Sequence, residues 1–60
     1  MEQYIFLIGS QREYLCTAAS RLDAQLKADN FVDRELEMTE PYGWVPSSQG
    51  PNIFRMSVGA

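Results

Sequence analysis

Few side chains in this 60-residue sequence could carry out chemistry. It has no histidine and one cysteine, Cys16, so the usual general base near neutral pH is missing and a thiolate has no histidine to activate it. The same shortage excludes a tetrahedral zinc site. Glu35 and Glu37, two residues apart, are more typical of a solvated strand face than of paired catalytic carboxylates. We therefore expect a protein that is not an enzyme and that has no metal and no cofactor.

Aromatic and basic side chains could instead bind a small anionic ligand such as a nucleotide. Tyr42 and Trp44 stand among glycine, proline, serine and glutamine, a setting typical of recognition surfaces, where an aromatic ring can stack on a base. Trp44 is the single tryptophan and could equally complete the core, so both interpretations stay open. The candidate phosphate ligands are Arg12, Arg34, Arg55 and the amides near Ser10.

The junction at Ser10 is the most defined of these positions. An apolar segment enters a glycine turn at Gly9, and we expect a helix to begin directly after it. Free amides at a helix N-terminus attract anions, and a phosphate there would offset the unfavourable placement of Arg12 in the first turn. An ordinary solvated first turn is the alternative.

Arg34 and Arg55 fall at expected strand positions, where each could bind a phosphate, pair with an acid across a dimer or reach solvent past a sheet edge.

The charge of the chain is concentrated in one segment. Residues 33–40 hold four acids and one arginine, which equals the whole net charge of −3, so the remainder is neutral. The four acids are Asp33, Glu35, Glu37 and Glu40, and we expect them to form an acidic strand that could dock on a basic protein. A protein-binding inhibitor is therefore the main alternative function. There is no basic stripe, which argues against a nucleic-acid partner.

The elements that must position these residues follow from patterning. The prediction is a strand over 3–8, a helix over 11–28 that starts with a capping box of Ser10 and Glu13, a strand over 31–39, a loop over 40–51 and a strand over 52–58. This is a single α+β domain, residues 1–60, in which one helix packs on a three-stranded β-α-β-β sheet. The strand order stays open.

Homodimerisation is expected from the shortage of other stabilising devices. The chain can form neither an internal disulfide nor a zinc site, and the strand over 3–8 is apolar on both faces although one helix covers only one. A second copy related by two-fold symmetry would cover the other face, and the anionic ligand is then expected to bind at the dimer interface. The alternative is that the long loop folds back, with Tyr42 and Trp44 as its lid. A structural subunit of a larger assembly, contacting through this face, is a further possibility.

The N-terminus lacks a basic signal-peptide region, its apolar run is too short to span a bilayer, and one cysteine fits a reducing compartment. We therefore expect a cytoplasmic protein without a membrane partner. Very short, cysteine-poor chains without a catalytic inventory resemble, in kind only, phage and mobile-element proteins that sequester or block host factors. This resemblance implies binding or inhibition and carries no site residues.

Overall fold

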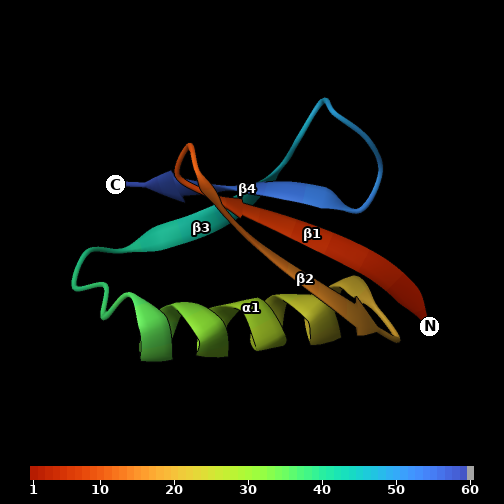
Figure 1. Cartoon of the computed structure of the whole chain (residues 1–60), viewed down its shortest axis with the longest axis horizontal. Coiled ribbons are helices and arrows are strands. Elements are labelled where there is room, and N and C mark those ends of the chain that lie inside the picture. Colours follow the sequence, from red (N-terminus) through yellow and green to blue (C-terminus); the bar gives the residue numbers. More distant parts are fainter. Residues whose placement is uncertain (60) are drawn as a thin grey trace.

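The computed structural model describes residues 1–59 and shows a four-stranded mixed sheet with one helix on one face (Figure 1). The elements in chain order are β1 (Glu2–Ile8), β2 (Arg12–Ala18), α1 (Arg21–Glu35), β3 (Tyr42–Pro46) and β4 (Ile53–Val58). The strands lie in the order β2-β1-β4-β3; the two central strands run parallel, and each edge strand is antiparallel to its neighbour. The domain is therefore α+β, as expected, but the three-stranded sheet was wrong.

The largest correction concerns residues 11–20, which were expected to be helical and instead form an edge strand. Gly9 has a φ of 68°, and this left-handed backbone lets the chain reverse within three residues. Two seven-residue strands then pair along their full length, from Glu2 with Ala18 to Ile8 with Arg12. Ser10 therefore lies in a hairpin turn and caps no helix.

The helix begins ten residues later than its predicted capping box. Ser20 is the N-cap, and its hydroxyl accepts a hydrogen bond from the amide of Asp23 at 3.2 Å. The buried stripe consists of Ala24, Ala28 and Val32, spaced four residues apart, and small alanines let α1 approach the sheet closely. The alternation in residues 31–39 that suggested a strand was thus misleading, because Val32 continues this stripe.

The expected loop over 40–51 is shorter, because Tyr42–Pro46 form edge strand β3. Proline is tolerated there, since an edge strand leaves one row of amides unpaired. The connection of residues 47–52 extends away from α1 (Figure 1). The strands expected over 3–8 and 52–58 are confirmed with small changes at their ends.

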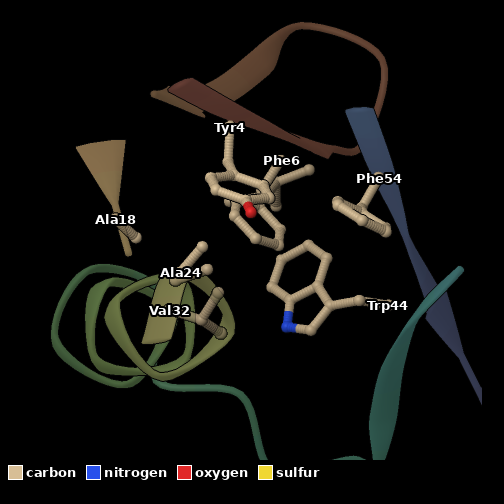
Figure 2. Packing of buried hydrophobic residues seen from close by; sticks show 9 residues of the cluster. Tyr4, Phe6, Ala18, Ala24, Val32, Trp44 and Phe54 are labelled. Atoms are coloured by element: carbon tan, nitrogen blue, oxygen red, sulfur yellow. The ribbon is translucent and has the colours of Figure 1, made fainter. Parts of the chain in front are cut away.

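The core lies between the sheet and α1. Figure 2 shows Phe6 and Trp44 filling the space between the strands and Ala24 and Val32 of the helix. The ring of Phe6 meets the Trp44 indole edge to face at a centroid distance of 4.9 Å and stacks on Phe54 at 5.5 Å. All buried side chains of the described residues are hydrophobic.

The face of the sheet opposite α1, here named the open face, carries side chains in rows set by the strand register. One row runs from β2 to β3 as Glu13, Leu7, Arg55 and Val45. The neighbouring row is Leu15, Ile5 and Ile53. Tyr42 and Trp44 do not cover this face, so the predicted aromatic lid was wrong. In the described part of the chain, no helix is long and apolar enough to cross a bilayer.

Candidate functional site

A hollow of about 430 Å³ lies at the end of the open face beside the β1–β2 turn, and we name it the turn hollow. Two parts of the chain border it: residues 7–13, which contain the end of β1, the turn and the start of β2, and residues 49–55, which contain the end of the β3–β4 connection and the start of β4. The bordering residues are Leu7, Gly9, Ser10, Gln11, Arg12, Glu13, Gln49 and Arg55. Three of the predicted ligand residues, Ser10, Arg12 and Arg55, therefore come together there.

Arg55 is placed on the floor of the turn hollow by the two central strands. In the register, Arg55 lies between Leu7 of β1 and Val45 of β3, so its aliphatic stem runs among apolar neighbours. Its side chain projects from the open face because Phe54 and Met56 turn towards α1. Arg12 begins β2 beside the turn and is also exposed, but its register partner is Ile8, which is buried on the α1 side, so the Arg12 side chain leaves the sheet on the face opposite to that of Arg55.

The residues that border the turn hollow carry a formal charge of +1, from Arg12 and Arg55 against Glu13. On the open face itself the charges of Arg55 and Glu13 balance, and Arg12 adds its positive charge from the rim at the turn. Within residues 1–59 the single ion pair joins Lys27 to Asp23 at 3.8 Å, so neither arginine has a carboxylate of the described chain in bonding distance. Ser10, Gln11 and Gln49 add hydroxyl and amide donors.

Trp44 and Tyr42 are on the opposite side of the sheet from the turn hollow. Trp44 is 8% exposed, and its Nε1–H donates to Asp29 Oδ1 at 2.8 Å. The Tyr42 hydroxyl donates to the same oxygen at 3.2 Å. Of the two roles left open for Trp44, the structure therefore supports the core role, and neither ring can stack on a ligand in the turn hollow.

Burial raises the pKa of Tyr42, and the nearby negative charge of Asp29, its hydrogen bond to the hydroxyl and the charge of Asp33 act in the same direction. The hydroxyl therefore stays protonated and keeps its bond to Asp29 at neutral pH. Sequence reasoning missed Asp29, since nothing in the pattern distinguishes one exposed-looking helical acid from another.

Arg34 and the predicted acidic strand occupy a different region. Asp33, Arg34 and Glu35 lie in the last turn of α1, where a cation is favourable for the helix dipole, whereas Glu37 and Glu40 follow in the connection to β3. All of these side chains are exposed. The acids thus form an exposed cluster without a strand, and Arg34 does not join the turn hollow.

Cys16 and the potential metal-ligating side chains do not form a cluster in the described residues. Cys16 is half-buried on β2, and the pKa of its thiol is raised. Burial is the largest cause; the positive charge of Lys27 opposes the increase and the negative charge of Asp23 adds to it. No group of three or more potential metal-ligating side chains occurs within residues 1–59.

Two further residues of the turn hollow, Gln11 and Gln49, were missed from sequence. Gln11 was assigned to a helix, and Gln49 could be placed near Arg55 only once the short connection between β3 and β4 was known. The only feature of the sequence that could have indicated them is their setting: Gln11 is a polar residue beside a glycine turn, and Gln49 is a polar residue in a proline-rich loop.

Comparisons with protein-family models, curated proteins and solved structures found no significant match to this chain. The site is therefore interpreted from its own geometry.

Proposed function

We propose that this protein is a small non-enzymatic binding protein that holds an anionic ligand, such as a phosphate-bearing small molecule, in the turn hollow. The observation that carries the proposal is the convergence of Arg12, Arg55 and Ser10 from two separate parts of the chain on one hollow. Guanidinium groups without carboxylate partners suit phosphate, which they can bind through two parallel hydrogen bonds.

The position of Arg55 supports a ligand more directly than its charge does. Leu7 and Val45, the neighbours of Arg55 in the sheet, can contact only its aliphatic stem. The guanidinium group therefore has no hydrogen-bond partner among these neighbours and is free to bind an anion. Glu13 borders the same hollow and repels an anion. We therefore expect modest affinity that falls as salt is added.

Recognition of a nucleotide would rest on its phosphates. Tyr42 and Trp44 point towards α1 and bind Asp29, so a base would meet aliphatic side chains in place of an aromatic platform. We expect inorganic pyrophosphate and ADP to bind with affinities within about tenfold of each other.

Isothermal titration calorimetry with pyrophosphate tests the proposal. Arg55→Ala should weaken binding by roughly tenfold or more, as expected when one charged hydrogen-bonding group is lost. Arg34→Ala is the matched control, because it removes another exposed arginine, remote from the turn hollow, and it should bind as the wild type does. Absence of binding to wild type at high micromolar concentration, or equal losses in both variants, would reject the proposal.

Docking on a basic protein is a second candidate function. It is supported by the exposure of the four acids of residues 33–40 and by the absence of an ion pair to them within residues 1–59. Reversing the charges of Glu35 and Glu37 should weaken capture of a partner and flatten its salt dependence. Capture that is indifferent to both reversals would exclude this candidate.

A further inference from the structure

The open face is an apolar surface that nothing in the described chain covers. Leu15 is 58% exposed and Val45 37% exposed, and Ile5, Leu7 and Ile53 are half-buried between them. The register places Leu15, Ile5 and Ile53 side by side, Leu7 lies next to Ile5 along β1, and Val45 follows on the far side of Arg55. Contiguous apolar surface of this kind on a small domain marks an interaction site.

The charges on the open face select its occupant. Glu13 lies on one side of Leu7 and Arg55 on the other, in the same row. Consider a two-fold axis that runs parallel to β1 and lies above it, between the two sheets. This rotation places the β2 side of one copy over the β4 side of the other, and each row of side chains faces the same row of the second copy. Glu13 of each copy then faces Arg55 of the other, so the surface is complementary to itself in charge.

We propose that the open face binds a second copy of this chain around such an axis, as two sheets packed face to face. The apolar rows match in the same arrangement. Leu15 of one copy meets Ile53 of the other, and Leu7 meets its own counterpart on the axis. An axis running across the strands, between the two rows, is unfavourable because it places Glu13 and Arg55 on apolar side chains.

Two other surfaces for a second copy are weaker. The free edge of β2 is partly blocked, because Lys27 of α1 donates to the Thr17 carbonyl at 2.8 Å, a charged side chain that hinders strand addition. Leu22 and Leu26 are exposed on the outer side of α1, at 73% and 63%. They form a pair only one helical turn long, and the charges beside them, Asp23 and Lys27, already pair with each other within the chain.

Sedimentation equilibrium in the absence of phosphate and nucleotides tests the dimer through a charge exchange. Glu13→Arg places two like charges opposite each other, and so does Arg55→Glu, so each variant should raise the dimer dissociation constant by roughly tenfold or more. The double variant, Glu13→Arg with Arg55→Glu, restores both pairs and should return the constant to near its wild-type value. A monomeric wild type up to about 0.5 mM, or a double variant as weak as the singles, overturns the proposal.

Substitutions of two leucines distinguish between the open face and the outer side of α1 as the dimer interface. Leu15→Ser should weaken the dimer, whereas Leu22→Ser should leave it unchanged, although Leu22 is the more exposed of the two. Both substitutions are at exposed positions, so both variants are expected to fold. The reverse result would assign the interface to the helix and would overturn the proposal.

The dimer goes beyond the proposed ligand site but shares Arg55 with it. A bound anion and Glu13 of the second copy compete for that guanidinium, so pyrophosphate should raise the dimer dissociation constant of the wild type. The two proposals fail separately. Dimerisation is measured without an anion, and the contribution of Arg12 to anion binding does not involve the apolar rows.

Discussion

Asp29 Oδ1 accepts two hydrogen bonds from edge strand β3, one from Trp44 Nε1 at 2.8 Å and one from the Tyr42 hydroxyl at 3.2 Å. Because Asp29 lies at the middle of α1, this single oxygen fastens the helix to the far edge of the sheet, beyond the strands on which α1 mainly packs. These two hydrogen bonds keep both aromatic rings on the helix side of the sheet. The open face therefore carries Arg55 and its apolar neighbours and neither of these rings.

Removal of this carboxylate should therefore destabilise the fold. Asp29→Ala leaves the buried Trp44 N–H without its partner, a loss of about 1–3 kcal/mol in the free energy of unfolding. Asp33→Ala, one turn further along the same helix and exposed, should change it by less than about 0.5 kcal/mol. Urea denaturation of the two variants measures the difference, and equal values would remove Asp29 from its structural role.

The raised pKa of Tyr42 gives the stability a dependence on alkaline pH. The unfolded chain loses the Tyr42 proton near the ordinary tyrosine pKa of about 10, whereas the folded chain holds it to higher pH. The contribution is therefore complete below about pH 10 and disappears as pH rises through the folded pKa. Tyr42→Phe should show a shallower fall in unfolding free energy between about pH 9 and 11 than wild type. Parallel curves for the two proteins would contradict the assignment.

The start of the helix can be tested by a pair of serines. Ser20→Ala removes the N-cap that accepts from the Asp23 amide and should lower the free energy of unfolding by about 1 kcal/mol. Ser10→Ala, in the hairpin turn, should have an effect below about 0.5 kcal/mol. If Ser10 proved to be the more costly serine, the helix would begin where the sequence pattern suggested.

The hairpin that replaces the expected helix depends on one glycine. Gly9→Ala forces a side chain into a backbone with φ of 68° and should destabilise the protein by about 1 kcal/mol. Gly43→Ala is the control, because an added Cβ there also meets no atom within 4 Å and no positive φ is required. Thermal unfolding of both variants should show a lower midpoint for Gly9→Ala only.

How much of this fold could be predicted from sequence differs between its halves. The first and last strands were identified by β-branched and aromatic residues, which act locally. The helix was misplaced because Ser10 and Glu13 imitate a capping box. Ser20, the actual N-cap, and Asp23 are not followed by an obvious apolar run, so they gave no comparable signal. Its buried stripe is made of alanines and one valine, whose hydrophobic signal is weak, while Leu22 and Leu26 face solvent.

The candidate site was predicted in part, for a similar reason. Ser10, Arg12 and Arg55 were identified by residue type, but the helix N-terminus expected to hold the anion does not exist at Ser10. Their convergence arises from the parallel pairing of β1 with β4, which brings Arg55 beside Leu7 across 47 intervening residues. Such long-range pairing depends on which strands occupy the centre of the sheet, and local patterning does not determine it.

A ¹H–¹⁵N correlation spectrum of the wild-type protein during titration with pyrophosphate tests the anion site residue by residue. We expect saturable shifts concentrated in the amides of residues 9–13, Gln49 and Arg55, and an affinity that decreases as salt rises. Shifts centred on Arg34 and the end of α1, or a spectrum unchanged at millimolar pyrophosphate, would contradict it.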